Sequence, residues 1–450
     1  MHRRTLGQGA LAAALAQAIA PNLLAQGTPA GEGWVTSWAA SVQGPYPVGN
    51  PSAQPNQSFI FPNPAEGARD QTLRLVLRPS LWGRQARLRF SNAFGTRPLA
   101  LDGVHVGLQH GGGALVPQTN RPVRFGGAEA VTIPPGGQAW SDPVDLPFAA
   151  EPDSPLLMGR KLAVSVHVVG PSGPMTWHAK ALQTSYATPP GAGSKGAQEG
   201  EEAFPFSTAS WFFLDAVDMT APAGTPVIVA LGDSITDGTA STMNGDDRWP
   251  DVLARRLNTT LGNRVSVVNA GIGGNQVVGP AQYGPDRPFP GGPSALTRLE
   301  RDVISLSGVT TVIWLEGTND FSRNGNASLD QVRDGMKEGV RKLREGIPGV
   351  RVIGATVTSA LGSSSAAHGH AEQDENRKGL NAFMRGGGLF DAVVEFDRAT
   401  LDPATGGLRP EMIPESTTGG PGDKLHPNRA GYLAMGSSID PASVLPARHQ

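Results

Sequence analysis

A single serine stands where a buried strand of the chain is expected to end. Residues 227–231 read Val-Ile-Val-Ala-Leu, an apolar run typical of a strand that is buried on both faces. Gly232, Asp233 and Ser234 follow at once, and Gly238 closes the turn. In an open α/β sheet, ligands bind beyond the carboxyl ends of the strands, and a serine hydroxyl there can attack a substrate if a base stands beside it. The alternative is an ordinary strand-to-helix turn in which the serine caps the helix.

Three further polar stretches stand at expected strand ends or in a late loop. Residues 269–275 read Asn-Ala-Gly-Ile-Gly-Gly-Asn, residues 316–320 read Glu-Gly-Thr-Asn-Asp, and residues 422–427 read Gly-Asp-Lys-Leu-His-Pro. The first two follow expected strands, as the serine turn does, and the third precedes the last expected helix. Because parallel strands end at one edge of a sheet, the three stretches at strand ends can face one crevice.

The elements that must position these stretches alternate between strand and helix patterns. Strands are expected at 227–231, 264–270, 309–315, 350–356 and 392–396. Helices are expected at 249–261, 296–306, 329–343, 376–384 and 429–439, where apolar residues recur at helical spacing. Such alternation predicts a parallel sheet with helices on both faces.

The chain before this region has a different pattern. In residues 72–78, Leu73, Leu75 and Leu77 alternate with residues that include Arg74, which predicts a strand with one buried and one wet face. Similar short runs separated by glycine and proline predict a β-sandwich or jelly roll. We therefore expect a β domain at 33–219, a linker at 220–226 and an α/β domain at 227–450. The polar, small residues of 188–203 suggest a mobile loop.

Five tryptophans of the β domain have two interpretations. They could stack on sugar rings or fill the core of the sandwich, and core packing is the more common role. They are Trp34, Trp38, Trp82, Trp140 and Trp177.

The four polar stretches resemble the four signature blocks of the SGNH hydrolases, also called GDSL esterases and lipases. The resemblance covers about half the chain, from residue 226 onward, and its strength lies in all four blocks occurring in order and in strand context. The first block reads Gly-Asp-Ser-Ile rather than Gly-Asp-Ser-Leu, a chemically silent change. The β domain also looks like the N-terminal domain of one bacterial branch of the family. The resemblance implies a three-layer, flavodoxin-like parallel sheet and an ester hydrolase that needs no cofactor.

The resemblance also implies a role for three side chains. Ser234 would be the nucleophile, which needs a base because its hydroxyl is barely ionised at neutral pH. His426 would be that base, since a neutral imidazole suits the working pH. Asp423 lies three residues earlier, and one short turn could hold its carboxylate against the second ring nitrogen of His426. The alternative for these two residues is a helix-capping loop in which Asn428 caps the helix.

By the same resemblance, the tetrahedral intermediate would be stabilised by three donors. These are the N–H of Ser234, the N–H of Gly274 and the side-chain amide of Asn319, and the neighbouring Gly273 leaves the register open by one. Asp233 and Asp320 are expected to be turn residues whose carboxylates accept local N–H groups.

A histidine-rich stretch at 368–374 could suggest a metal site. His368 and His370 lie near Glu372 and Asp374, but Ser363-Ser-Ser-Ala-Ala precedes them and marks a polar loop. A solvent-facing lid is the alternative that we favour, so no metal is expected.

Whole-chain properties limit the partners. The net charge of −2 offers no field to attract nucleic acid, and no stretch beyond the N-terminus is apolar enough for an integral membrane segment. Residues 1–26 carry Arg3 and Arg4 before an apolar run, which predicts a twin-arginine-like signal peptide; the alternative is a disordered basic tail. Export to the periplasm or the extracellular space would suit a chain without cysteine, whose domains rely on their cores.

The expected function is therefore an exported serine esterase that acts through an acyl-serine intermediate. Export, a β domain with spare tryptophans and the lack of an apolar docking segment favour short acyl groups, such as acetyl, on carbohydrate. Hydrolysis of aryl or short-chain lipid esters is the alternative within the same chemistry. An alternative of another class is a carbohydrate-binding protein with an idle hydrolase domain.

Overall fold

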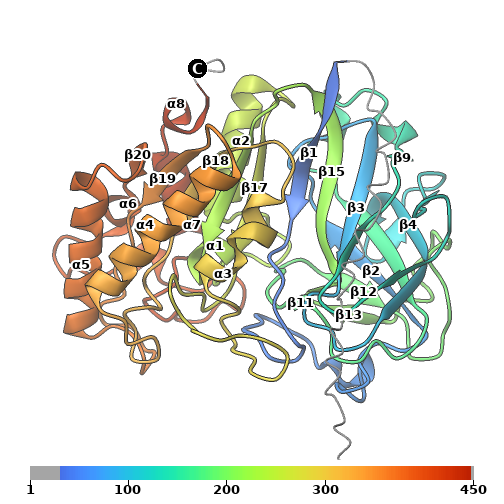
Figure 1. Ribbon diagram of the computed structural model, residues 1–450, viewed down its shortest axis with the longest axis horizontal. Coiled ribbons are helices and arrows are strands. Elements are labelled where there is room, and N and C mark those ends of the chain that lie inside the picture. Colours follow the sequence, from blue (N-terminus) through green and yellow to red (C-terminus); the bar gives the residue numbers. More distant parts are fainter. Residues whose placement is uncertain (1–30, 447–450) are drawn as a thin grey trace, which may run out of the picture.

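The computed structural model describes residues 31–446, in which an all-β part precedes an α/β part (Figure 1). The predicted signal peptide, residues 1–26, lies outside the described residues. The all-β part holds two larger antiparallel sheets and a short pair of strands. The first sheet has the order β1-β15-β3-β8, with β9 paired to β3: β1 (Glu32–Ala39), β15 (Leu214–Pro222), β3 (Gln85–Ser91), β8 (Gln138–Trp140) and β9 (Val144–Asp145).

The second sheet has the order β13-β12-β2-β10-β4-β5, and β6 and β7 also pair with β4. Its strands are β13 (Phe206–Thr208), β12 (Ser185–Ala187), β2 (Gln71–Leu77), β10 (Leu162–Val168), β4 (Leu99–Gly111), β5 (Ala114–Leu115), β6 (Arg121–Pro122) and β7 (Val131–Ile133). The short pair is β11 (Trp177–His178) with β14 (Trp211–Phe212). Apolar side chains of both larger sheets share one core, so the predicted all-β domain of antiparallel sheets is confirmed.

One detail of strand β2 corrects the sequence analysis. Leu73, Leu75 and Leu77 are buried as expected, but Arg74 on the predicted wet face is fully buried too. Residues 198–200, within the segment expected to be a mobile loop, cover it. The Arg74 guanidinium donates to the carbonyls of Gly200 (3.0 Å) and Gln198 and lies over the Phe204 ring. A polar segment therefore covers this face of the sheet and accepts hydrogen bonds from its buried cation.

The α/β part is built on a five-stranded parallel sheet of order β17-β16-β18-β19-β20. Its strands are β17 (Ser266–Gly271), β16 (Val227–Gly232), β18 (Val309–Leu315), β19 (Arg351–Ala355) and β20 (Ala392–Val394), all paired in parallel. Numbered within this domain, the order is 2-1-3-4-5, the flavodoxin-like arrangement. The predicted fold class is thus confirmed for the α/β part.

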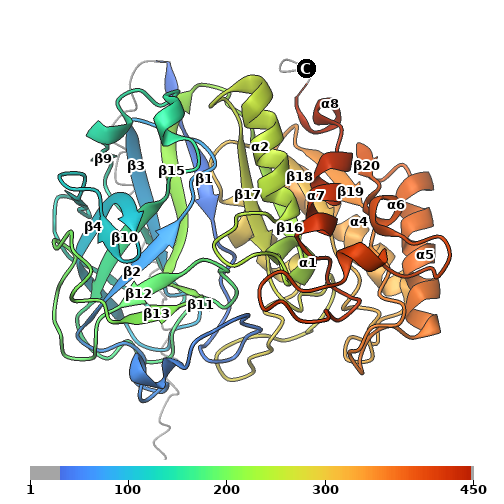
Figure 2. The same ribbon diagram turned by 180° about the vertical axis from the view of Figure 1, so that it is seen from behind.

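Helices cover both faces of the parallel sheet (Figures 1 and 2). Alternate strand residues such as Ile228 and Ala230 pack with α2 (Trp249–Leu261), α6 (Phe396–Thr400) and α7 (Arg429–Ser438). The residues between them, such as Val229, pack with α3 (Ala295–Leu299), α4 (Leu329–Gly346) and α5 (Ala371–Gly386). The last helix is α8 (Pro441–Val444).

Local chemistry explains where several helices begin. Ser328 and Gln331 form a capping box at the start of α4, and Asn428 caps α7 through the N–H groups of residues 430 and 431. The expected helix at 296–306 is α3 followed by a π-helical stretch, Glu300–Ile304. Helix α5 begins earlier than expected because the His370 side chain caps it.

The two parts of the chain are packed together closely. Strand β1 lies beside β17 (Figure 1), and the Ser266 hydroxyl donates to the Thr36 carbonyl at 2.7 Å. The apolar core of the β part continues into one face of the parallel sheet, and only residues 223–226 separate β15 from β16. Among residues 31–446, no helix combines the length and the apolar character needed to cross a membrane.

Candidate active site

Three polar side chains from two distant stretches form a chain of hydrogen bonds. Ser234 begins the short helix α1 (Ser234–Asp237) directly after strand β16, and its Oγ lies 2.8 Å from Nε2 of His426. Nδ1 of His426 lies 2.6 Å from Oδ2 of Asp423. The structure therefore brings together the three residues that the sequence analysis predicted as a triad. An alcohol, an imidazole and a carboxylate in this order can move a proton away from the alcohol as it attacks.

The turn before α7 fixes the relative positions of Asp423 and His426. Oδ1 of Asp423 accepts the backbone N–H groups of Leu425 (2.9 Å) and His426 (2.8 Å), while Lys424 adopts a left-handed φ of 59°. Burial would raise the pKa of Asp423, but the hydrogen bond and charge of His426 and the two N–H groups hold it well below its usual range. Asp423 therefore presents an ionised carboxylate to the imidazole.

The turn that carries Ser234 is held by its neighbours in sequence. Asp233 caps α1, since its carboxylate accepts the Ile235 N–H at 2.9 Å, as the sequence analysis predicted. Burial raises the pKa of Asp233 well above its usual value, although the bond from Ile235 opposes this. Gly238 ends the helix with a φ of 104°, a conformation that favours glycine. Asp233 thus shapes the turn that carries Ser234.

The predicted oxyanion donors lie on the loops after β17 and β18. Gly274 has a φ of 87°, so its backbone conformation also favours glycine. The Asn319 amide donates one hydrogen bond to the Asn275 carbonyl at 2.9 Å, which orients the side chain. The second N–H of the same amide is left to bind a ligand. Within residues 31–446, no partner accepts the backbone N–H of Ser234 or of Gly274. These donors can therefore serve a ligand.

A buried arginine that the sequence analysis missed ties the three strand-end stretches together. Arg298 of α3 has no exposed side-chain surface. Its guanidinium donates to the carbonyls of Gly232 (2.9 Å) and Ala270 (2.7 Å), and to Oδ1 of Asn275 (2.8 Å). It also pairs with Glu316 and Asp302. In the sequence it looks like any surface arginine of a helix, because only the fold shows which carbonyls meet it.

Two acids of the stretch 316–320 are buried. Burial raises the pKa of Glu316 to about 7, although Arg298 and the Trp314 N–H oppose the shift, and burial raises that of Asp320 to about 6. Asp320 lies in a turn as expected, but its carboxylate is not limited to local partners, because it accepts the N–H groups of Val277 (2.9 Å) and Val278 (3.1 Å). Asp320 therefore links its own turn to the loop that follows residues 269–275.

The histidine-rich loop lies against the triad turn. The hydroxyl of Ser363 and the N–H of Ser364 both donate to the Asp423 carbonyl at 3.0 Å. His368 is partly buried, and burial together with the charge of His426 lowers its pKa to about 4. His370 caps α5, so it is engaged in the fold. Among the described residues, no group of three acidic, histidine or cysteine side chains could hold a metal ion.

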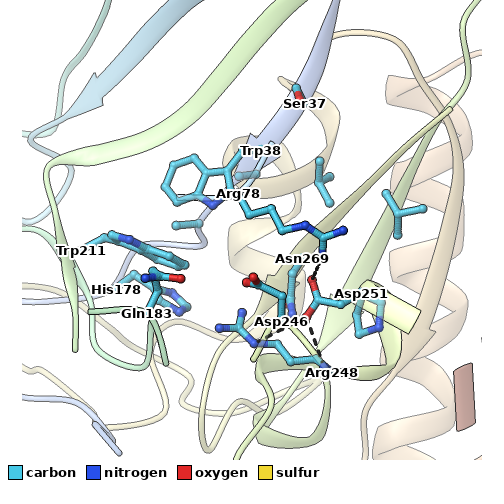
Figure 3. A pocket seen from close by; sticks show the side chains of 15 residues that line it. Ser37, Trp38, Arg78, His178, Gln183, Trp211, Asp246, Arg248, Asp251 and Asn269 are labelled. Atoms are coloured by element: carbon cyan, nitrogen blue, oxygen red, sulfur yellow. Dashed lines mark hydrogen bonds and ion pairs between the residues drawn. The ribbon is translucent and has the colours of Figure 1, made fainter. Parts of the chain in front are cut away.

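The β part reaches the same region. His178 is buried, and its Nε2 lies 3.1 Å from the Asp237 carboxylate of α1. It also lines a cavity of about 50 Å³ between the two parts, where Arg78 and Arg248 point toward Asp251 (Figure 3). The cavity is large enough to hold water, and neither Ser234 nor His426 lines it. It is separate from the hydrogen-bonded chain of the candidate site.

The tryptophans of the β part divide between the two interpretations. Trp38, Trp82 and Trp177 are buried in the core. Trp34 and Trp140 are half-buried, and both rings contact the Arg87 guanidinium, with centroids at 4.9 and 4.4 Å. A sugar-stacking role is therefore open to only two of the five.

The α/β part of the chain is similar to known proteins. Residues 230–434 match the model of the GDSL-like lipase/acylhydrolase family, and this range includes Ser234, Asp423 and His426. No curated protein matches the sequence.

Similar solved structures include a carbohydrate acetylesterase from Sinorhizobium meliloti, with 17% identity, 48% of this chain and 96% of that chain covered, and a TM-score of 0.34. A lipase/acylhydrolase from Enterococcus faecalis has 21% identity, coverage of 48% and 93%, and a TM-score of 0.36. An aryl esterase from M. smegmatis has 19% identity, coverage of 49% and 100%, and a TM-score of 0.35.

Proposed function

We propose, from the premise that the C-terminal domain belongs to the GDSL-like lipase/acylhydrolase family, that the protein is an exported serine esterase acting on short acyl esters of carbohydrate. Membership of this family makes it a carboxylic ester hydrolase with a small-molecule ester as substrate. The observation that carries the serine mechanism is the unbroken chain of hydrogen bonds from Asp423 through His426 to Ser234.

In the first half of the reaction, Oγ of Ser234 attacks the ester carbonyl carbon. Its proton passes to Nε2 of His426, 2.8 Å away, and Asp423 stabilises the imidazolium that forms. Collapse of the tetrahedral intermediate breaks the bond to the alcohol, which leaves with the proton from His426. The product at this stage is acyl-Ser234.

In the second half, water attacks the acyl carbon and gives a proton to His426. Collapse returns that proton to Ser234 and releases the acid. Both tetrahedral intermediates carry an oxyanion, which the N–H groups of Ser234 and Gly274 and the Asn319 amide would stabilise. Each such donor contributes about 3 kcal/mol to lowering the barrier.

Hydrolysis of p-nitrophenyl acetate by wild type and Ser234→Ala tests the serine mechanism. We expect the variant to lose at least about 10⁴-fold in kcat, because the nucleophile is gone. Equal rates in the two proteins would contradict an acyl-serine intermediate, and they would favour a carbohydrate-binding protein with an idle hydrolase domain.

The preference for acetyl groups on carbohydrate is supported by the acetylesterase among the similar structures and by half-buried Trp34 and Trp140. Aryl and lipid esters are the alternative, since an aryl esterase and a lipase/acylhydrolase are also similar. Release of acetate from acetylated xylan, measured beside hydrolysis of longer acyl esters, separates the two. No acetate from any polysaccharide would contradict the first preference. Export is supported by the paired arginines and apolar run of residues 1–26, and cell fractionation of the full-length chain would test it.

A further inference from the structure

We propose that Asn50, from the β part of the chain, is a positioning residue for the oxyanion hole of the α/β part. Its side-chain N–H donates to the Gly273 carbonyl, with Nδ2 and O 2.7 Å apart. The carbonyl of Gly273 and the N–H of Gly274 belong to one peptide unit, which is planar and points the two groups in opposite directions. A bond that fixes the carbonyl therefore also fixes the direction of the Gly274 N–H.

A glycine pair needs such a restraint more than any other dipeptide would. Glycine has no Cβ and visits positive and negative φ readily, so the peptide between two glycines can rotate at little cost. Gly274 already has a φ of 87°. In the proposed function, on which this inference rests, the Gly274 N–H must meet the oxyanion at a set position, and a donor that turns away loses its effect.

The β part also occupies the space that side chains would need at this pair. A Cβ on Gly274 would lie 2.6 Å from Nδ2 of Asn50, and one on Gly273 would lie 3.0 Å from Nζ of Lys180. Lys180 is itself buried, and its amine donates to the Thr239 hydroxyl. Two residues of the β part thus form a wall against which the glycine loop rests.

Asn50 can act in this way because its own loop is anchored on the α/β part. We call residues 41–50 the docking loop. Within it, the Gly44 N–H donates to the Tyr283 hydroxyl at 2.9 Å, and the Gln43 amide donates to the Pro290 carbonyl at 2.9 Å. Gly49 lets the loop approach the β part closely, since a Cβ there would lie 2.8 Å from that of Ala179. Asn50 therefore follows a segment held from both sides.

Two variants test the role of Asn50. Asn50→Leu keeps most of the side-chain volume and adds no charge but removes the N–H donor, and Asn50→Ala removes the whole group. We expect both to lower kcat and kcat/KM together by about ten-fold, with KM changed less than two-fold, because the lost interaction acts in the transition state. This loss is smaller than the 10²–10³-fold cost of deleting a donor, since the Gly274 N–H is still present.

A second measurement separates positioning from a general structural effect. A boronic acid that forms a tetrahedral adduct on Ser234 places an oxygen in the same hole, so its affinity should fall by the same factor as kcat/KM. Asn56→Ala is the matched control, because Asn56 is an exposed asparagine nearby whose side chain accepts only a local N–H from Ser58. It should leave kcat, KM and boronate affinity within two-fold of wild type.

Wild-type kcat in a folded Asn50 variant, or a lowered kcat with unchanged boronate affinity, would overturn the inference. Asn50→Leu decides the matter if Asn50→Ala does not fold, since it keeps most of the side-chain volume. The outcome is distinguishable from failure of the proposed function. If Ser234→Ala is inactive while the Asn50 variants behave as wild type, only the positioning role fails; if Ser234→Ala keeps its rate, the serine mechanism fails.

Discussion

The two sides of the candidate site are supported in different ways. On the triad side, Asp423 and His426 lie three residues apart, and the Asp423 carboxylate is held by backbone N–H groups of their own turn. On the oxyanion side, the glycine loop is held by residues far away in sequence, Arg298 and Asn50. Acid–base geometry can therefore be built into one short turn, whereas the direction of a backbone N–H in a glycine loop needs a scaffold.

The electrostatics of the two sides also differ. The Asp423 side chain is 37% exposed, and its pKa is held low by His426 and by backbone donors against the effect of burial. Glu316 and Asp320, beneath the oxyanion side, have no exposed surface, and burial raises their pKa values. The triad side thus holds a stable negative charge on Asp423. On the oxyanion side, burial favours the neutral forms of Glu316 and Asp320.

The largest expected effect comes from breaking the triad side. Asp423→Asn keeps the shape of the side chain but removes the charge that supports the imidazolium and favours the wrong tautomer of His426. We expect kcat on p-nitrophenyl acetate to fall by about 10³–10⁴-fold. Glu372→Gln on the exposed face of α5 is the control and should change kcat less than two-fold. Similar small losses in both variants would mean that Asp423 is not the triad acid.

A smaller effect is expected from the oxyanion side. Asn319→Ala removes one neutral donor while the triad stays in place, so kcat should fall by about 10²–10³-fold with little change in KM. The pH at which activity rises should not move, because no titrating group of the triad is altered. Asn324→Ala, an exposed asparagine in the same loop, is the control. A shifted pH profile in Asn319→Ala would show that the two sides are not independent.

The same contrast explains what the sequence could and could not predict. Ser234, Asp423 and His426 lie in short stretches next to expected strands and helices, so the resemblance of those stretches to the signature blocks of a family was enough to propose them. Arg298 and Asn50 act on backbone carbonyls across the fold, and no local pattern marks a residue with such a partner. The distant partners of Asp320 were missed for the same reason, since its carboxylate bonds to Val277 and Val278 of another loop. Arg74 was misplaced because a distant segment covers its face of the sheet.

The smallest expected effect concerns stability rather than rate. Burial raises the pKa of Glu316 from 4.5 to about 7, so between these values the native state keeps a proton that the unfolded chain has released. The free energy of unfolding should therefore fall as pH rises from about 4.5 to about 7, by up to about 3 kcal/mol from this group. Glu316→Gln cannot titrate, and it keeps a carbonyl that can accept from the Trp314 N–H.

Urea unfolding of wild type and Glu316→Gln at pH 5 and pH 8 would measure this difference. At pH 5 both side chains are neutral, and the two proteins should differ little. At pH 8 wild type carries a charged Glu316 in the core and should have lost more stability than the variant. Asp320, with its pKa near 6, titrates in both proteins and leaves a residual slope in the variant. Equal slopes in the two proteins would mean that Arg298 fully compensates the buried charge, so that the oxyanion side resembles the triad side in holding an ionised acid.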